Sequence, residues 1–412
     1  IHKMAPGDGD SWKRIEILVY LLGFLDLFGV SLIIPLLPKL ARELGASPTT
    51  TGFVGSLYGS LQLFSSPVIG RLSDRAGNKL MLVNCLVLSA CGYLLMGLAS
   101  SVFLLLLSRI PTGLFKHTQE LSRNYLSKTL PSSRHSLAFG RFNGFSSLGF
   151  ILGPLVGGHM TDMKYGYHAI AITTAAIFFL SSFIIWCLLP PTPDLKDSSF
   201  DKKKSSGGFS LKQYFQDLAK VDWSSMWDLF AIRLLLSLAV MVYRSNFSLM
   251  LDYRFGASGK VTGYIISYGS VVGMLSGFLV GKISSFYSSD SKLMIHSSLL
   301  QVASLTSMAF APTLPIFIAC MTPLSLANAI SRVSVTKVTM QRGQGQDIGL
   351  LLGLGASTLS VSRMISSLVG GVAQDLHING PSLVSSVTAA LGVAVMVFGP
   401  YDWFADRHTK VD

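Results

Sequence analysis

Long apolar runs recur along the whole chain, and no other feature of the sequence restricts its fold as strongly. Each run holds roughly 18–25 mostly apolar residues, the length that an α-helix needs to cross about 30 Å of hydrocarbon. We place twelve such runs, in two sets of six. They cover residues 15–38, 51–71, 80–99, 102–121, 139–160 and 167–189, then 228–250, 260–281, 293–311, 314–332, 346–372 and 382–402. The sequence therefore predicts an all-α membrane protein with twelve transmembrane helices in two six-helix bundles.

The overall composition excludes an ordinary soluble domain. Hydrophobic residues make up 50% of the chain and charged residues 13%, about half the charged share of a soluble domain. The formal net charge is +12, but the basic residues lie mostly in short gaps between apolar runs. This placement indicates membrane topology and not nucleic-acid binding. The four cysteines lie inside apolar runs without metal-ligand spacing, so we expect no bound metal.

The distribution of lysine and arginine predicts the orientation. If the N-terminal segment 1–14, which lacks the apolar core of a cleavable signal, is cytoplasmic, the outer segments hold few basic residues. These are Lys39, Arg42, Lys164, Arg254 and Lys260, whereas the inner segments hold many more, with Arg332 and Arg342 among them. We therefore expect both termini, including the tail 403–412, in the cytoplasm. The sequence does not distinguish a plasma membrane from an endolysosomal one.

Residues 190–227 separate the two sets of apolar runs. Pro, Ser, Gly and Lys dominate the first part of this stretch, so we expect a solvated cytoplasmic linker. Within it, SLKQYFQDLAK resembles a short amphipathic helix at the membrane surface.

The two sets of runs resemble each other in sequence, which indicates an internal duplication. LVGGHMTD at 155–162 is matched by LVGGVAQD at 368–375, SRNYLSK at 122–128 by SRVSVTK at 331–337, and GRLS at 70–73 by GKIS at 281–284. The separations between partners are 213, 209 and 211 residues. A duplicated six-helix unit explains this near-constant spacing, and it predicts pseudo-symmetric halves at 15–189 and 228–402.

Two motifs identify a family. The loop GRLSDRAGNK at 70–79 has the spacing G-x-x-x-D-R-x-G-x-K and contains Gly70, Asp74, Arg75, Gly77 and Lys79. It resembles the cytoplasmic signature of the major facilitator superfamily. The run GRFNGFSSLGFILGPLVGGHMTD resembles the fifth-helix motif of that superfamily's proton-coupled drug antiporters, through Gly140, Gly149, Gly153, Pro154, Gly157 and Gly158. Such small residues allow close packing of helices in lipid, and we expect a bendable surface at the seam between the bundles.

Other segments extend the resemblance along the whole chain, with some departures. RIPTG at 109–113 resembles the fourth-helix signature, and shorter segments such as GFLDLFGV and KVTGYIISY resemble one vertebrate member of the superfamily. Lys128 stands where the family usually has an acid, and Ser285 is the counterpart of Asp74. Ser366 and Ser367 replace Gly153 and Pro154 in the second half. These departures make the cytoplasmic lock asymmetric, so drug antiport cannot be carried over whole.

Charged residues inside the apolar runs are candidates for function, because a charge in the bilayer centre costs at least about 2.5–3.5 kcal/mol. Asp26 lies near the middle of the first run and Arg109 in the fourth, at depths that differ by about 4–6 Å. We expect these two residues to form a pair that responds to protonation of Asp26, or alternatively a static structural pair. His117 could relay protons or could be an interfacial histidine with a backbone partner.

Three charges near the inner surface are candidates for a cytoplasmic gate. We expect Glu120 to pair with Arg75, and we expect Asp74 to face the start of the eleventh helix near Gly349. A carboxylate is favoured there by the helix dipole. Together these contacts would hold the cytoplasmic side closed.

The seventh run carries further candidates for a substrate cavity. Arg233 and Arg244 are eleven residues apart, or three turns, and therefore share one helix face. This face suits an anionic substrate, and Arg363 could add to it, unless the arginines pair with carbonyls or lipid head groups. Tyr243 and Asn246 lie beside them, and Asn246 fits the glycosylation pattern but lies too deep for its use.

The sequence contains no motif for enzyme chemistry, nucleotide binding or a cofactor. We therefore expect a monomeric secondary transporter whose partners are the lipid bilayer, a small organic solute and protons, without nucleic acid or nucleotide. Two alternatives remain open at this point, namely an uncoupled facilitator and a membrane sensor or assembly partner that retains the transporter fold.

Overall fold

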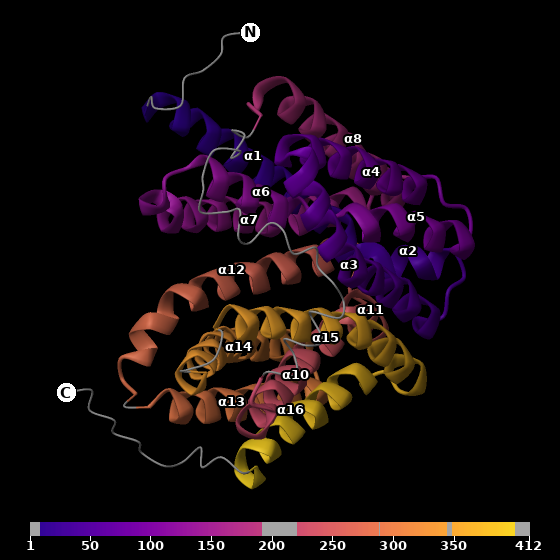
Figure 1. The fold of residues 1–412 in the computed structure, drawn as a ribbon. Helices are drawn as coiled ribbons and strands as arrows, with labels where there is room; N and C mark the ends of the chain where they lie inside the picture. Colours follow the sequence, from indigo (N-terminus) through magenta and orange to yellow (C-terminus); the bar gives the residue numbers. More distant parts are fainter. Residues whose placement is uncertain (1–8, 192–220, 288, 344–347, 400–412) are drawn as a thin grey trace, which may run out of the picture. The chain divides into compact units, whose positions relative to one another are not determined.

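The computed structural model describes residues 9–191, 221–287, 289–343 and 348–399, and within these ranges the chain is helical without strands (Figure 1). The predicted linker helix at SLKQYFQDLAK lies outside the described residues, as do most of the N-terminal segment and the C-terminal tail. The all-helical fold class is confirmed, and each of the twelve predicted runs coincides with one helix or with two consecutive helices.

The first half of the chain forms eight α-helices and one short 3₁₀ turn. In order these are α1 (Gly9–Ile33), η1 (Ile34–Leu36), α2 (Leu37–Glu43), α3 (Pro48–Ala76), α4 (Asn78–Gly97), α5 (Val102–Phe115), α6 (Thr118–Thr129), α7 (Ser132–Met160) and α8 (Gly166–Leu188). Gly77 joins α3 to α4 with a φ of 89°. This left-handed conformation explains the glycine in the loop motif, because other residues adopt it only with strain.

The second half forms seven helices in the described ranges. They are α10 (Trp223–Ser245), α11 (Phe247–Phe255), α12 (Gly259–Ser284), α13 (Asp290–Phe310), α14 (Leu314–Arg342), α15 (Ile348–Leu376) and α16 (Gly380–Phe398).

Among the described residues, nine helical segments are long and apolar enough to cross a membrane. The second, fourth and fifth predicted runs fall short of that standard. Serine, threonine and glycine dilute the apolar character of α3 and α7, and the fourth run is divided into the short helices α5 and α6.

Three of the predicted runs contain a break, which the apolar pattern does not reveal. The first run is interrupted by η1, the fourth at Lys116 and His117, and the seventh at Asn246. A break in a membrane helix leaves backbone groups without their helical partners, and such groups are tolerated only where protein or water satisfies them. The breaks are therefore places where polar side chains from neighbouring helices are expected to gather.

The described chain forms two compact units. The first contains Ile1–Pro193, Ser245–Val271 and Ser367–Gly380, and the second contains Asp194–Arg244, Val272–Ser366 and Pro381–Asp412. In the first unit α1 packs on α7 and α8, and α4 packs on α5 and α8. Buried residues such as Leu32, Leu86, Tyr93 and Phe178 form its core. In the second unit α13 packs on α14.

Candidate functional site

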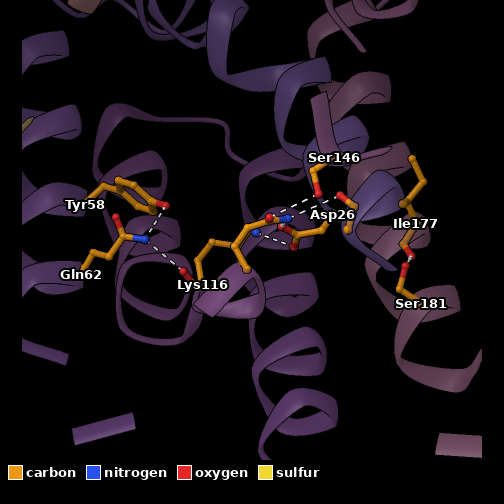
Figure 2. A network of polar contacts seen from close by, with 9 residues as sticks. Asp26, Tyr58, Gln62, Lys116, Ser146, Ile177 and Ser181 are labelled. Carbon is orange, nitrogen blue, oxygen red and sulfur yellow. Dashed lines mark hydrogen bonds and ion pairs between the residues drawn. The ribbon is translucent and has the colours of Figure 1, made fainter. Parts of the chain in front are cut away.

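A buried ion pair lies where the fourth run is broken. The ammonium group of Lys116 donates to Asp26 Oδ1 over 2.5 Å, and the side chains of Lys116 and Asp26 are 6% and 0% exposed. Gln119, one residue into α6, donates its amide to Asp26 Oδ2 at 2.9 Å. Asp26 on α1 is thereby held by two donors from the broken helix, as Figure 2 shows for Lys116.

The pair of Asp26 and Lys116 has further contacts with α7 and with an aromatic ring on α8. Gln119 also donates to the Gly23 carbonyl oxygen at 3.4 Å, and Ser146 on α7 donates to Gln119 Oε1 at 3.4 Å. The Lys116 ammonium lies 5.0 Å from the centre of the Phe178 ring. This distance is within the range of a cation–π interaction. The charge of Lys116 is therefore compensated from two directions inside a buried site.

Side chains of α3 satisfy the backbone at the break. Gln62 donates its amide to the Lys116 carbonyl oxygen at 3.0 Å and to the Tyr58 hydroxyl at 3.3 Å (Figure 2). Ser65 is hydrogen-bonded to His117 Nε2 at 2.8 Å. Side chains of α3 therefore form hydrogen bonds with the residues at which the fourth run is broken. The side chain of His117 also has a backbone partner, as considered from sequence, in a hydrogen bond to Leu114. Its relay role stays a prediction.

The predicted pair of Asp26 and Arg109 is wrong. Arg109 is 2% exposed, its Nη2 donates to the sulfur of Met96 at 3.3 Å, and its Nε has no partner in the described chain. Arg109 lies within α5 and Lys116 directly follows its last residue. On an unbroken helix the two, seven residues apart, would share a face and lie about 10 Å apart along the axis. The depth of a residue in the membrane was estimated from the assumed ends of each run. That estimate was too coarse to decide which of the two cations pairs with Asp26.

The glycines of the fifth-helix motif pack α7 against α1. A Cβ atom added to Gly149 or Gly153 would lie 2.9 Å from the Phe28 nitrogen or 2.8 Å from its carbonyl oxygen. One added to Gly157 would lie 2.5 Å from the Leu32 carbonyl oxygen. These helices therefore touch backbone to backbone, as small residues allow in membranes. By contrast, a Cβ on Gly140 would meet no atom within 4 Å.

The same motif also brings α7 against the start of α12. A Cβ on Gly158 would lie 3.0 Å from the Gly259 carbonyl oxygen and 3.1 Å from the Cα of Gly263, and the Pro154 carbonyl also faces Gly263. This contact lies inside the first compact unit.

A second glycine crossing, missed from sequence, joins α3 to α15 in that unit. A Cβ on Gly371 would lie 3.1 Å from the Cα of Gly52. Gly52 and Gly263 are 211 residues apart, and Gly158 and Gly371 are 213 apart. The two crossings therefore join equivalent positions of the internal repeat. The matching dipeptides Thr51–Gly52 and Thr262–Gly263 were the available sequence signal.

Two basic residues that the sequence assigned to the outer segments share an acid on α11. Asp252 on α11 forms ion pairs with Arg42 and, at 3.8 Å, with Lys39 of α2. Lys39 is 3% exposed and donates to the Ala257 carbonyl oxygen at 2.6 Å. Sequence reasoning used Lys39 and Arg42 only as topology markers and overlooked their acid.

Two further contacts lie close by. Asp375 at the end of α15 accepts hydrogen bonds from the backbone nitrogen of Thr49, at 2.9 Å, and from its hydroxyl. The hydroxyl of Tyr264 on α12 is hydrogen-bonded to His159 Nε2 of α7 at 3.0 Å. Each of the two equivalent glycine crossings therefore has a polar side-chain contact between the same two helices.

The predicted cytoplasmic gate differs from the observed contacts. Asp74 pairs with Lys128 at 2.6 Å, and Lys128 also donates to Asn78 at 3.3 Å. Glu120 and Arg75 are both exposed, and no ion pair joins them in the described chain, so that expected pair is wrong. Lys128, which stands where the resemblance to the family implies an acid, is therefore the partner of Asp74.

The remaining residues of the loop motif have varied surroundings. Lys79 lies with its ammonium 5.8 Å from the centre of the Trp186 ring. A Cβ on Gly70 would meet no atom within 4 Å in the described part of the chain, so no other helix packs closely on this glycine there. The environment of Gly349 lies outside the described residues. In the second half Lys337, the counterpart of Lys128, contacts Asp290 at 3.2 Å.

The arginine face predicted on the seventh run lies in α10. The guanidinium of Arg233 packs on Gly355 of α15, where a Cβ would clash with it, and its Nη1 has no partner in the described chain. Arg244 and Arg363 are exposed.

The two polar neighbours of that face are buried. Tyr243 is 3% exposed and Asn246 is 1% exposed. Asn246 precedes α11 at the break and donates its amide to the Pro48 carbonyl oxygen at 3.4 Å.

Two carboxylate–arginine pairs at the starts of α1 and α10 were also missed from sequence. Arg342 donates from Nη1 to both oxygens of Asp228 at 2.9 Å, and Arg134 pairs with Glu16 at 3.1 Å. Both acids are buried, with exposures of 1% for Asp228 and 4% for Glu16. An acid in the first turns of an apolar run was the available signal, but its partner is more than a hundred residues away.

Comparison with known proteins extends this description. The chain is 24% identical to Multidrug resistance protein 1 of Bacillus subtilis (strain 168) over 405 residues, which covers 97% of this chain and 98% of that protein. It is 26% identical to Solute carrier family 22 member 18 of Mus musculus over 371 residues, covering 87% and 89%. The solved structure of the nucleoside transporter NupG shares the fold, with a TM-score of 0.75, 14% identity and coverage of 92% and 97%.

The sequence profile of the Major Facilitator Superfamily matches residues 19–367, which is most of the chain. The match includes the loop motif, the broken fourth run and the fifth-helix glycines described above. The chain is thus an integral, multi-pass membrane protein, and it belongs to the major facilitator superfamily of membrane transporters.

Proposed function

We propose that this protein moves a small organic solute by alternating access and couples that movement to protons through Asp26. The observation that carries the proposal is the buried pair of Asp26 and Lys116 at a helix break. Acids and bases buried at membrane depth are rare and are associated with ion pathways and proton relays. The resemblance of the fifth-helix motif to proton-coupled antiporters supports the same assignment.

The chemistry of coupling follows from the two charges. While Asp26 is ionised, it compensates the charge of Lys116 inside a site that is closed to solvent. A proton on Asp26 removes that compensation and leaves a buried cation without its counter-ion. Such an uncompensated charge costs about 3–5 kcal/mol, which is enough to favour a conformation in which Lys116 reaches water or a solute. Lys116 therefore replaces Arg109 as the partner that protonation releases.

The glycine crossings and the outer ion pairs supply the other half of the proposal. Contacts of Asp252 and Asp375, together with the crossings at Gly158 and Gly371, would hold the outer side closed when both termini are cytoplasmic. They would separate when the halves 15–189 and 228–402 rock, as in other transporters built from repeats. The pair of Asp74 and Lys128 would take part in closing the inner side.

Reconstitution into liposomes tests the proposal. Purified protein in vesicles loaded with a pH-sensitive dye is exposed to a panel of organic cations, anions and neutral metabolites. Coupled transport predicts that at least one solute moves protons across the membrane, and that empty vesicles show no such signal. Solute flux without proton movement would make the protein a facilitator. The absence of any flux across the panel would favour a non-transporting role.

A further inference from the structure

Gln119 connects the buried carboxylate of Asp26 to α7 through the two ends of one amide. Its nitrogen donates to Asp26 Oδ2 at 2.9 Å and to the Gly23 carbonyl oxygen at 3.4 Å. Its oxygen accepts a hydrogen bond from Ser146 Oγ at 3.4 Å. Gln119 is the second residue of α6, so a side chain directly after the helix break joins α1 to α7. All of these residues belong to the first compact unit.

A close approach of α1 and α7 places Ser146 within reach of this amide. A Cβ atom added to Gly23 would lie 2.6 Å from Ser146 Oγ, so the missing side chain leaves room for the hydroxyl. Ser146 is 3% exposed, and Gln119 is its one hydrogen-bond partner among the residues that the structure describes. The adjacent Ser147 donates instead to the Asn143 carbonyl oxygen of its own helix at 2.8 Å. Of the two serines, Ser146 is therefore the one that links α7 to the amide.

The ionised carboxylate fixes the orientation of the amide. A carboxylate and a carbonyl oxygen only accept hydrogen bonds, whereas an amide donates from its nitrogen and accepts at its oxygen. Because Asp26 Oδ2 and the Gly23 carbonyl lie on one side, Gln119 directs its nitrogen there and its oxygen towards Ser146. Lys116 donates to the other carboxylate oxygen, Oδ1. While Asp26 is ionised, each of these donors therefore has an acceptor.

A proton on Asp26 reverses that requirement. The Lys116 ammonium has no acceptor atom, so while it contacts Oδ1 the added proton is held on Oδ2, which faces the Gln119 nitrogen. Two donors then oppose each other. Rotation of the amide by half a turn removes the conflict, because Oδ2–H then donates to Gln119 Oε1 and Gln119 Nε2 donates to Ser146 Oγ. The hydrogen bond between α6 and α7 changes direction, and the Gly23 carbonyl loses its donor.

The other titratable side chains around the ion pair do not contact the Asp26 carboxylate. On α4, Tyr93 interacts electrostatically with Asp26 and Cys85 with Lys116, and both side chains are neutral near neutral pH. His117 is hydrogen-bonded to a serine of α3. The network receives a hydroxyl from α7 and an aromatic ring from α8. Gln119 is therefore the uncharged group that responds directly to a proton on Asp26.

We infer that Gln119 is a positioning residue that transmits protonation of Asp26 to α7 through Ser146. The inference rests on the proposed coupling at Asp26 and adds the path by which it reaches a neighbouring helix. The glycines of α7 pack on α1 along the same crossing, at Gly149 for example. Loss of the hydrogen bond to the Gly23 carbonyl therefore weakens the contact between α1 and α7 beside the ion pair.

Asp26→Asn produces the protonated arrangement at constant pH. Its amide oxygen accepts from Lys116, which only donates, and its amide nitrogen then faces Gln119 as a protonated carboxyl does. Hydrogen exchange, measured by mass spectrometry on the full-length protein in lipid nanodiscs, compares this variant with the wild type around Gly23 and Ser146. Exchange there should accelerate roughly 2- to 10-fold, the equivalent of one hydrogen bond. The change is expressed relative to α8, so that a general loss of stability cancels.

The same comparison in three variant backgrounds tests the path. In Gln119→Met and in Ser146→Ala, the effect of Asp26→Asn on α7 should disappear, because the hydrogen bonds that carry it are absent. In the matched control Ser147→Ala, the effect should equal that in the wild type. An unchanged effect in Gln119→Met would overturn the inference, and so would an equal loss of the effect in Ser146→Ala and Ser147→Ala.

Infrared difference spectroscopy between high and low pH gives a readout that a purely structural role does not move. The carbonyl band of protonated Asp26 is identified by its absence from Asp26→Asn. A carboxyl that donates to an amide oxygen absorbs at a lower frequency than one without a hydrogen bond. The band should therefore shift to higher frequency in Gln119→Met and stay in place in Ser147→Ala. An unshifted band in Gln119→Met would contradict the proposed contact between the acid proton and the amide.

Both measurements are made without transport, so a failure of the inference is distinct from a failure of the proposed function. If uptake by Gln119→Met responds to a pH gradient as uptake by the wild type does, the inference is overturned, while proton coupling through Asp26 stands.

Discussion

The ion pair of Asp26 and Lys116 predicts an unusually large coupling energy. Lys116→Met leaves the Asp26 carboxylate buried with only the amide of Gln119 as a donor. Asp26→Asn leaves the Lys116 ammonium buried beside the Phe178 ring. Removing one partner of a buried pair costs about 3–5 kcal/mol in the free energy of unfolding. Each single variant should therefore be destabilised by about that amount.

The double variant Asp26→Asn/Lys116→Met should recover most of this loss. It buries neither charge, and replacement of a buried ion pair by uncharged side chains is often neutral or stabilising. The cycle should therefore give a coupling energy of at least about 3 kcal/mol. Exposed pairs usually give only about 0.2–1 kcal/mol, so the value follows from the side-chain exposures of 0% for Asp26 and 6% for Lys116.

The chain provides a matched control for this cycle. Asp74 and Lys128 have the same residue types and nearly the same distance, 2.6 Å, but their side chains are 62% and 26% exposed. The cycle Asp74→Asn/Lys128→Met should give less than about 1 kcal/mol. Equilibrium unfolding in one detergent at one pH measures both cycles. Equal coupling energies in the two cycles, or additive effects at Asp26 and Lys116, would refute the reasoning.

Three further changes have defined outcomes. Gln62→Leu leaves the Lys116 carbonyl unsatisfied and should lower the free energy of unfolding by about 1–3 kcal/mol; an unchanged midpoint would mean that water replaces the amide. Gly158→Leu should lower it by about 1–3 kcal/mol through overpacking, whereas Gly140→Ala, in open space, should not, and equal effects would contradict the packing described for the motif. Asp252→Asn removes the acid shared by two cations and should speed amide hydrogen exchange in α11, and unchanged exchange would show that the ion pairs do not hold that helix.

The helices were predictable from sequence because lipid imposes a single requirement, a long apolar run. The breaks were not predictable, since each depends on a partner elsewhere in the chain. At Lys116 the carbonyl is satisfied by Gln62, which lies 54 residues away and has no local signature of that role.

The functional importance of Asp26 was evident from its charge at membrane depth, but its partner was not. In an unbroken helix Arg109 and Lys116, seven residues apart, would share one face. A small error in the assumed helix ends therefore selects the wrong cation. The glycine motif predicted close packing, and the structure shows that packing on α1 and α12. Its equivalent contact between Gly52 and Gly371 was missed because α3 and α15 are brought together only by the fold.

Proton dependence of transport in the Asp26→Asn variant tests the central claim most directly. Initial rates of uptake into liposomes are measured with and without an imposed pH gradient, for the wild type and for the variant at equal protein density. The coupling described here predicts that the gradient changes the wild-type rate, and that the variant either transports without response to the gradient or does not transport. A variant that transports and responds to the gradient as the wild type does would contradict the assignment of Asp26 as the proton acceptor.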